Sequence, residues 1–519
     1  MKSIFLHLLS GTTLGICFHF PSFSLLVFIA LMPIIYSKCY IGETNNLISI
    51  SILRNFVFAI SFNFIALSWA LNNDFFIGLL LIFTNTAFSF IALMLYEFNI
   101  RVFGGGKLVL FYFFWIFLDM LSLNWELNFP WLITGNLLSN YIDLIQWYEY
   151  TGVIGGSIWV LLVNTLLVDF FIFGRRKTLT YIVCLTPILF SFLLSRKETY
   201  KNEKARKVVV IQPNIDPHYE KRSMPYILQM NKIANLIKLQ KDSANFLVLP
   251  ETTLEKLLIN EISSTPYLPY FTSIVKHDTN FSVITGVNLN DRNQDNSIES
   301  FNSVISYSDK VTNIYHKNKF IPFIEKIPYT QYWNEKFKRE VDLFFESSDF
   351  SNKVRDYSHC LANGDKLTTL VCYEGLFGEY ASNLVNKSQT EVIIITSNEG
   401  WWNQTYFNKQ FLDFVKLRSV ENRKWIVKCS NTGISAVINP NGKIIDSIGY
   451  GKSGCLSSTV YLNSQITFYS KYGDWIGYAF LGALFLFYVI FFVAKMNQNI
   501  NPIFYRSKIS SGAADSKKS

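Results

Sequence analysis

The sequence has little charge for its size. Of its 519 residues, 16% are charged and 50% are hydrophobic, whereas an ordinary soluble domain is roughly 25% charged. This composition excludes a disordered or collagen-like chain and argues against a single compact soluble domain. The net charge of +9 would favour nucleic acid only if the basic residues formed one patch, so their positions matter more than their sum.

Cysteine and histidine are also scarce. The seven cysteines are odd in number and include no Cys-x-x-Cys pair, and the six histidines are scattered. A complete disulfide framework and a zinc site are therefore not indicated, and we expect neither a metal nor a cofactor. The run Gly104 to Lys107 lacks the spacing of a phosphate-binding loop, and no Gly-x-Ser-x-Gly occurs.

The hydrophobic residues are concentrated in long runs. About 20 apolar residues are needed to cross a bilayer core, and several runs approach this length. Buried helices of a soluble core would alternate with polar surface, which these runs do not do. The sequence therefore predicts an α-helical membrane bundle with eight spans, near residues 3–18, 22–37, 55–71, 75–97, 107–123, 151–173, 179–195 and 473–494.

Basic residues lie in alternate loops between these runs. Lys38 and Arg54 follow the second run, Arg175 to Lys177 follow the sixth, and the loops on the other side carry none. The positive-inside rule then places both termini in the cytoplasm and the block 196–472 outside. The basic linker 196–207 departs from the simple rule, but long domains cross largely regardless of charge. The positive charge thus indicates membrane orientation, and we expect no nucleic-acid binding.

The start of the chain has a second interpretation, a cleaved signal peptide, because Leu14-Gly15-Ile16-Cys17 faintly resembles a lipoprotein cleavage site. Ile16 is bulkier than the small residue that such a site requires, so we favour a retained span.

Between the last two runs the sequence changes character. Short β-rich runs alternate with amphipathic stretches, which is typical of an α/β arrangement with the sheet covered on both faces. The turn Asn439-Pro440-Asn441-Gly442 predicts a hairpin. The expected strands lie at 208–211, 246–249, 282–285, 370–371 and 392–395, and the expected helices at 224–241 and 407–425.

Three segments carry reactive side chains where strands should end. They are Pro250-Glu251, the stretch from Lys317 to Glu325, and Cys372-Tyr373-Glu374. Taken singly, each has an ordinary explanation as a surface carboxylate, a solvated ammonium and a core thiol. Because α/β proteins place their sites at strand ends, however, the three groups could converge.

Their order and context resemble the nitrilase superfamily: Glu after Pro, Lys with a second Glu eight residues on, and Cys-Tyr-Glu. Membrane spans on both sides make the chain resemble, more closely, the apolipoprotein N-acyltransferases of the bacterial inner membrane. The chain departs from that pattern at Ile324, where Gly is usual, and at Glu399, where Asp is usual. Segments that also fit the family are 129–132, 212–215, 398–402, 418–423 and 430–435.

The resemblance implies a multi-span bundle carrying a nitrilase-like α-β-β-α sandwich. It implies transfer of an acyl chain from a phospholipid, through a Cys372 thioester, to the N-terminal amine of a diacylglyceryl-cysteine apolipoprotein. Glu251 would accept the proton and Lys317 would stabilise the oxyanion. Supporting roles are expected for Glu325, Tyr373 and Glu374, and a place along the lipid path for Trp401 and Trp402.

The predicted organisation has four parts. Residues 1–200 form a seven-span domain, 201–466 a periplasmic catalytic domain, 467–497 an eighth span, and 498–519 a cytoplasmic tail that we expect to be disordered. We expect a monomer.

Two other functions fit parts of the sequence. A membrane-tethered amidohydrolase would use the same three residues with water as acceptor, although one span would suffice as its tether. A transporter or receptor with a degenerate nitrilase-like sensor would not keep the triad intact, and it would carry more charges within its spans.

Overall fold

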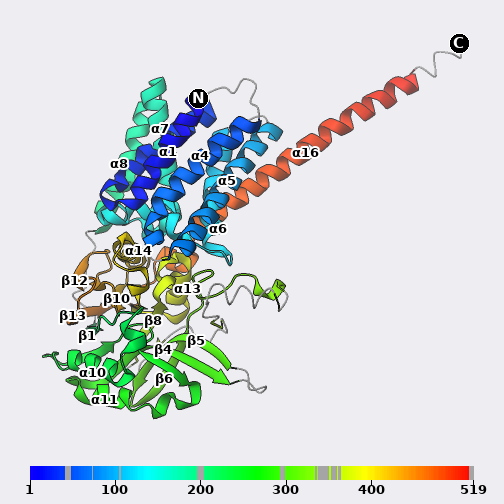
Figure 1. Ribbon diagram of the computed structural model, residues 1–519. Helices are drawn as coiled ribbons and strands as arrows, with labels where there is room; N and C mark the ends of the chain where they lie inside the picture. Colours follow the sequence, from blue (N-terminus) through cyan, green and yellow to red (C-terminus); the bar gives the residue numbers. More distant parts are fainter. Residues whose placement is uncertain are drawn as a thin grey trace.

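The computed structural model describes residues 1–40, 48–72, 74–103, 107–195, 204–292, 298–333, 336, 350–351, 359–360 and 364–512. Figure 1 shows a bundle of helices at one end of the molecule and two β-sheets with their covering helices at the other. The long C-terminal helix starts between the sheets and the bundle, passes beside α6 and runs obliquely away from the other helices.

Most of the apolar runs form long helices. The bundle consists of α1 (Lys2–His19), α4 (Ile48–Leu67), α5 (Phe75–Phe103), α6 (Lys107–Asn124), α7 (Tyr148–Phe173), α8 (Lys177–Ser195) and α16 (Trp475–Gly512). Residues 21–40 instead form four short pieces, η1 (Pro21–Leu26), α2 (Val27–Ala30), α3 (Met32–Ile35) and η2 (Tyr36–Tyr40). Pro21 and Pro33, which lack a backbone N–H, lie in the first turns of η1 and α3.

Seven stretches of the described residues are long and apolar enough to cross a membrane, one fewer than the eight expected. They are Pro21–Tyr40, Ile48–Asn72, Phe75–Val102, Lys107–Asn124, Tyr148–Phe173, Lys177–Ser195 and Trp475–Val493. The exception is the first expected span, which does form a helix, α1. Lys2, His7 and His19 lower the hydropathy of its 18 residues.

The outer block contains two sheets. One has the order β13-β1-β2-β4-β5-β6 with β3 paired to β4, and the other the order β12-β11-β10-β9-β8-β7. The first comprises β1 (Lys204–Gln212), β2 (Ala244–Val248), β3 (Leu254–Leu258), β4 (His277–Arg292), β5 (Ile298–Ser308), β6 (Lys310–His316) and β13 (Gly454–Leu462). The second comprises β7 (His359–Cys360), β8 (Lys366–Val371), β9 (Val392–Ser397), β10 (Trp425–Ser430), β11 (Ser435–Ile438) and β12 (Ile444–Ile448).

Successive side chains of β1 point to opposite faces of the first sheet and so contribute to two different buried layers. Val208 and Val210 join a buried cluster with residues of the second sheet, whereas Val209 and Ile211 join one with α10 (Tyr226–Ile237) and α11 (Tyr267–Ile274). Helices α13 (Gly378–Ser388) and α14 (Tyr406–Asn422) pack with the second sheet. The predicted fold class, a membrane bundle plus an α-β-β-α sandwich, is therefore confirmed.

Short elements complete the chain and join its two halves. Trp131 in η4 stacks on Phe407 of α14, with ring centroids 4.9 Å apart, so the start of α14 lies directly against the bundle. The short elements are η3 (Ser68–Asn72), η4 (Pro130–Leu132), η5 (Thr134–Leu144), α9 (Glu220–Ser223), η7 (Ile259–Ser264), η8 (Thr330–Tyr332), η9 (Cys372–Leu376), η10 (Glu399–Trp402) and α15 (Phe468–Tyr472).

Candidate active site

Cys372 lies at a sharp turn between a strand and a helical segment. The strand β8 ends at Val371, and η9 begins with Cys372 itself, whose φ is 48°. A positive φ is costly for any residue with a side chain, and such strain is concentrated at functional sites. The turn holds the thiol at the end of β8, with 8% of the residue exposed.

Lys317 lies between two carboxylates. Its Nζ donates to Glu325 Oε1 at 2.6 Å and is 3.6 Å from Glu251 Oε1. Glu251 follows β2 after two residues, and Lys317 directly follows β6, so the ends of two strands of one sheet bring them together. The lysine is completely buried, so its charge has to be compensated by neighbouring carboxylates.

The electrostatics connect these three groups to Cys372. Burial raises the pKa of the Cys372 thiol well above its ordinary value, the Glu251 carboxylate raises it further, and Lys317 lowers it. Burial alone would lower the pKa of Lys317, but Glu325 and Glu251 outweigh this and hold it above its ordinary value. The resting site therefore has a protonated thiol beside a permanently charged ammonium.

Asn302, which the sequence does not single out, positions Glu251. Its side-chain amide donates to Glu251 Oε1 at 2.7 Å. Its backbone carbonyl oxygen accepts from the Lys317 backbone N–H at 2.8 Å. Asn302 lies in the middle of β5, where nothing local in the sequence marks it. The pairing of β5 with β6 brings it beside Lys317, and the pairing of β5 with β4 brings it beside Glu251, because Pro250 bonds to Gly286 of β4.

Glu325 is held in turn by its own loop. Its Oε2 accepts from the backbone N–H of Ile321 at 2.9 Å, while Oε1 binds Lys317. The turn from Ile321 to Glu325 thus aims the carboxylate at the ammonium. Ile324, where the family pattern has Gly, lies within this turn and lines a cavity beside it.

Glu374 joins the cysteine turn to the lysine loop and does not face a ligand space. Its oxygens accept from the backbone N–H groups of Asn318 at 2.7 Å, Lys319 at 3.2 Å and Val371 at 2.8 Å, and from the Tyr315 hydroxyl at 2.7 Å. It is completely buried. This set of contacts indicates that Glu374 fixes the position of Cys372 relative to Lys317.

A cavity lies between the active-site segments and the bundle, although Glu251, Lys317 and Cys372 do not themselves line it. Tyr373 and the turn Ile321–Ile324 line about 670 Å³ of empty space together with residues of η3, α5 and η4, and we call this the active-site cavity. The Tyr373 hydroxyl donates to the carbonyl of Asn128, in the loop that follows α6. The residue after the expected nucleophile thus contacts the membrane-spanning part of the protein.

The two tryptophans that we expected along the lipid path lie in different environments. Trp402 is buried, lines the active-site cavity, and packs on Trp69 with ring centroids 5.5 Å apart. Trp401 is 41% exposed and contacts His218 with an edge-to-face ring geometry. Of the two tryptophans, only Trp402 lines the active-site cavity.

Glu399, the other departure from the family pattern, forms a buried ion pair with Lys428. The hydroxyls of Ser397 and Ser430 donate to the same Glu399 oxygen at 3.0 and 2.7 Å. A Cβ at Gly433 would lie 2.8 Å from the Glu399 carboxyl carbon and 3.0 Å from its Cβ, so glycine at 433 leaves room for this side chain. Among the described residues, no group of three or more His, Cys, Asp or Glu could hold a metal ion.

Comparisons with known proteins match both halves of the chain. Residues 207–466, half of the sequence, match the carbon-nitrogen hydrolase family, and residues 10–166 match the apolipoprotein N-acyltransferase N-terminal domain. A solved structure of an amidase from Nesterenkonia sp. aligns over 50% of this chain and 91% of its own, with 14% identity and a TM-score of 0.32.

Named relatives extend across nearly the whole chain. An apolipoprotein N-acyltransferase of Chlorobaculum tepidum is 25% identical over 93% of this chain and 95% of its own length. That of Pseudomonas paraeruginosa is 26% identical over 71% of each, and that of Aquifex aeolicus 26% identical over 63% of this chain and 70% of its own. The chain therefore belongs to the carbon-nitrogen hydrolase family, as a membrane-embedded acyltransferase of the apolipoprotein N-acyltransferase group.

Proposed function

We propose that this enzyme moves an acyl chain from a phospholipid to the N-terminal amine of a diacylglyceryl-cysteine apolipoprotein, through a thioester on Cys372. The observation that carries the proposal is the active-site cavity, which is lined by Tyr373, the residue next to Cys372, and by residues of the membrane helix α5. A small water-soluble amide would need no such lining, whereas a lipid ester must reach the thiol from the bilayer.

In the first half of the reaction, Glu251 takes the proton of Cys372 as Sγ attacks the ester carbonyl carbon. The oxygen that becomes negative is stabilised by the Lys317 ammonium, with the backbone N–H of Tyr373 as second donor. The carbon–oxygen bond to glycerol then breaks. Glu251 returns the proton to the departing oxygen, which leaves a lysophospholipid and the thioester.

In the second half, the neutral amine attacks the thioester carbonyl and gives its proton to Glu251. The same two donors stabilise the oxyanion, and the carbon–sulfur bond breaks as the amide forms. The thiolate takes the proton back, so the resting site is restored. Each half transfers one proton to and from Glu251, which the Asn302 amide holds in position.

We further propose the domain boundaries and orientation that the sequence predicts. The bundle would comprise residues 1–200, the catalytic domain 201–466, the last span 467–497 and a cytoplasmic tail 498–519. The catalytic domain would face the periplasm and both termini the cytoplasm. The alternating basic loops support this orientation.

Intact mass spectrometry of the purified protein, incubated with phospholipid, tests the proposal. We expect a mass increase of one acyl group that disappears in Cys372→Ala and persists in Cys455→Ala, a cysteine on β13. Adding a diacylglyceryl-cysteine peptide should discharge the adduct and acylate the peptide. If no adduct forms under any condition, the proposal is wrong. Release of ammonia from small amides would favour the amidohydrolase instead.

A further inference from the structure

The turn that carries Glu251, residues 250–253, has an unusual backbone, and we call it the base turn. Thr252, which directly follows Glu251, has a φ of 51°. This conformation is costly for a β-branched side chain. It persists only where the surrounding contacts enforce it. The contacts of the base turn therefore show what holds the proposed proton acceptor in place.

On one side, the base turn rests against strand β4. The backbone N–H of Gly286 donates to the carbonyl of Pro250 at 3.1 Å. A Cβ at Gly286 would lie 2.5 Å from the Cα of Glu251 and 2.6 Å from the backbone N of Thr252, so this close approach requires glycine. The Thr253 hydroxyl also donates to the Pro250 carbonyl, at 2.8 Å. The residue before Glu251 is thus fixed to the sheet.

On the other side, a single lysine holds the residue after Glu251. The Lys221 ammonium donates to the Thr252 carbonyl oxygen at 3.1 Å and to the Thr252 hydroxyl at 2.5 Å. It also pairs with the carboxylate of Glu255, in β3, at 2.7 Å. In the described part of the chain, no other side chain donates to Thr252. The strained residue therefore depends on Lys221 for its polar contacts.

Lys221 is held in turn by its own segment. It lies in α9, where its backbone N–H donates to the Asp216 carbonyl at 2.8 Å and its carbonyl accepts from the Gln229 side chain at 3.2 Å. The same segment is bound to the second sheet, because the backbone N–H of Asn214 donates to the carbonyl of Asn431 at 3.0 Å. The lysine therefore extends to the base turn from a fixed support.

The pair of Lys221 and Glu255 is mostly buried. The lysine side chain is 15% exposed and the glutamate side chain 26%. Removing two charges from water costs much of what their attraction gains, so such a pair adds little to overall stability. This favours a role in fixing the geometry of the turn between the two residues.

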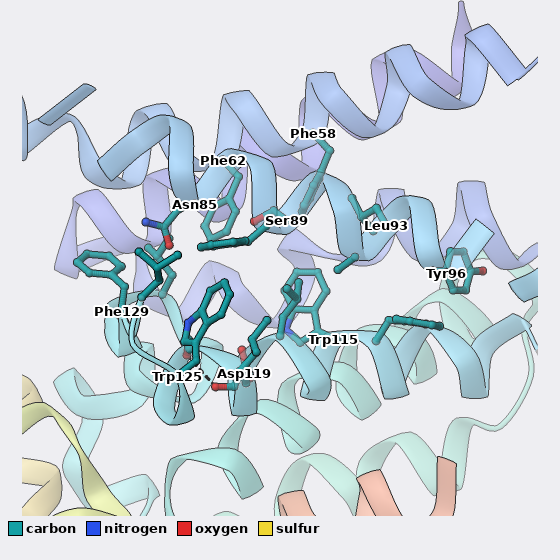
Figure 2. Close-up of a pocket in the computed structure, with 18 of the residues that line it drawn as sticks. Phe58, Phe62, Asn85, Ser89, Leu93, Tyr96, Trp115, Asp119, Trp125 and Phe129 are labelled. Atoms are coloured by element: carbon teal, nitrogen blue, oxygen red, sulfur yellow. Dashed lines mark hydrogen bonds between the residues drawn. The ribbon is translucent and has the colours of Figure 1, made fainter. Parts of the chain in front are cut away.

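Lys221 and Glu255 lie apart from the spaces that a lipid chain could enter. Neither lines the active-site cavity. Neither lines the separate cavity inside the helix bundle, around which Figure 2 shows Phe62 of α4 and Trp115 of α6. A slower reaction after substitution of either residue would therefore not be explained by a lost contact with lipid.

We propose that Lys221 is a positioning residue for Glu251: by holding Thr252, it fixes the base turn so that the Glu251 carboxylate faces the Cys372 thiol. This inference rests on the proposed function, because Glu251 is the proton acceptor of that reaction. Asn302 holds the carboxylate itself, whereas Lys221 holds the backbone beside it. The two contacts therefore restrain the same side chain at its two ends.

Alkylation of Cys372 by iodoacetamide, in the full-length protein in detergent, tests this role because it needs the base but no lipid. Lys221→Met keeps the length of the side chain and removes its donors. We expect the rate at pH 7 to fall about tenfold and to rise toward pH 9, where free thiolate reacts without the base. In the Glu251→Gln background, where the base is already absent, Lys221→Met should change nothing.

Lys232→Met is the matched control. Lys232, in α10, also donates to a backbone carbonyl, that of Asn214 at 2.9 Å, and also pairs with a glutamate, Glu220 at 3.7 Å, but it does not contact the base turn. We expect it to react like the wild type at both pH values. Alkylation of the other cysteines is measured in Cys372→Ser and subtracted.

Glu255→Gln tests the role even if Lys221→Met does not fold. It leaves the donors of Lys221 in place but removes the charge that anchors them. The loss of a partly exposed ion pair should slow alkylation at pH 7 about threefold, again only where Glu251 is present.

Equal slowing by Lys221→Met with and without Glu251 would overturn the proposal, because the lysine would then not act through the base. Wild-type rates in both Lys221→Met and Glu255→Gln would also overturn it. Neither result would affect the proposed acyl transfer, since the acyl adduct is measured separately with phospholipid. If no adduct forms in a protein that shows the expected alkylation pattern, acyl transfer is wrong and the positioning role stands.

Discussion

At the residue scale, the sequence identifies the groups that react but not the groups that hold them. Glu251, Lys317 and Cys372 follow strands in recognisable segments, and the structure brings the two acids of the site onto Lys317. Asn302 has no such local signal, because its role arises only when β5 pairs with β4 on one side and β6 on the other. Its contact with Glu251 nevertheless fixes where the proposed base points.

Replacing Asn302 with alanine should slow thioester formation by about ten- to a hundredfold. The substitution removes a hydrogen bond to a buried charged oxygen, worth roughly 1.5–3 kcal/mol, and this loss would appear in the barrier if Glu251 is then misplaced. The measurement is the rate of acyl adduct growth by intact mass. Asn235→Ala, at an exposed position of α10, should be unchanged. An Asn302→Ala rate equal to wild type would show that Glu251 needs no such support.

The raised pKa of Cys372 predicts how alkylation should depend on pH. Because burial and Glu251 keep the thiol protonated, iodoacetamide can react at neutral pH only if Glu251 takes the proton during attack. We expect a nearly flat rate between about pH 7 and 9 in the wild type. Glu251→Gln should be slow at pH 7 and rise about tenfold per pH unit, as expected when only free thiolate reacts.

The control for this experiment is Cys372→Ser, which measures alkylation of the remaining cysteines. After that background is subtracted, a wild-type rate that rises in parallel with that of Glu251→Gln would contradict general-base catalysis by Glu251. Lys317→Met should depress alkylation further, because Lys317 lowers the pKa of the thiol.

At the element scale, continuous apolar runs and turn chemistry were enough to predict much of the catalytic domain. The predicted strands at 208–211 and 392–395 fall within β1 and β9, and the Asn439–Gly442 turn joins β11 to β12. The antiparallel pairing of β1 with β13 could not be predicted, because about 250 residues separate the two strands. Nor does the sequence show that residues 21–40 form four short helices rather than one.

Substitution of Glu374 tests how the Cys372 turn is joined to the loop after β6. Its carboxylate receives backbone N–H groups from both the Cys372 turn and the loop after β6. In Glu374→Gln, an amide NH₂ would face those donors, so we expect a loss of about 2–4 kcal/mol of stability and a strong fall in thioester formation. Thermal unfolding in detergent measures the first and adduct mass the second.

The matched control is Glu391→Gln, directly before β9 and beside the first residue of β8. Glu391 also accepts a backbone N–H, from Lys366 at 2.9 Å, but that bond is exposed. We therefore expect Glu391→Gln to change the unfolding temperature little. If Glu374→Gln is as stable as the wild type, the contact between the Cys372 turn and the loop after β6 does not depend on the carboxylate.

At the scale of the whole molecule, the catalytic domain is fastened to the bundle by polar contacts as well as by stacked rings. Arg423, at the end of α14, donates to Glu149 at 2.5 Å, to the Gln146 side chain at 2.6 Å and to Asn441 at 2.8 Å. The contacts to Gln146 and Glu149 cross from the catalytic domain to the start of α7, whereas the contact to Asn441 stays within the catalytic domain. No local pattern in the sequence could identify the two partners in and before α7, which lie more than 270 residues away.

Arg423→Leu should lower the unfolding temperature by several degrees, because it leaves a mostly buried Glu149 without its partner. The contrast is Lys443→Met, which breaks an exposed ion pair to Asp143 at 3.5 Å across the same junction. Exposed pairs contribute about 0–1 kcal/mol, so this variant should unfold near the wild-type temperature. Equal shifts in both variants would contradict a specific role for Arg423.

The structure shows which end of the helix bundle carries the basic loops, and this predicts the orientation of the protein in the membrane. In Figure 1 the N-terminus lies at the end of the bundle far from the sheets, and the described basic loop residues Arg101, Lys107 and Lys177 belong to helix ends on that same far side. If the positive-inside rule holds, that end is cytoplasmic and the catalytic domain is periplasmic. The rule applies to the far end alone, so the basic linker near residue 204 does not enter the argument.

Labelling of single cysteines in intact bacteria tests which side of the membrane the catalytic domain faces. In a background without reactive cysteines, Asn235→Cys on α10 should react with a membrane-impermeant maleimide in whole cells, because it is exposed on the catalytic domain. Lys177→Cys, exposed at the start of α8, should react only after the inner membrane is permeabilised. The reverse pattern would place the catalytic domain in the cytoplasm, where a periplasmic apolipoprotein could not be its acceptor, and the proposed reaction would then need another amine.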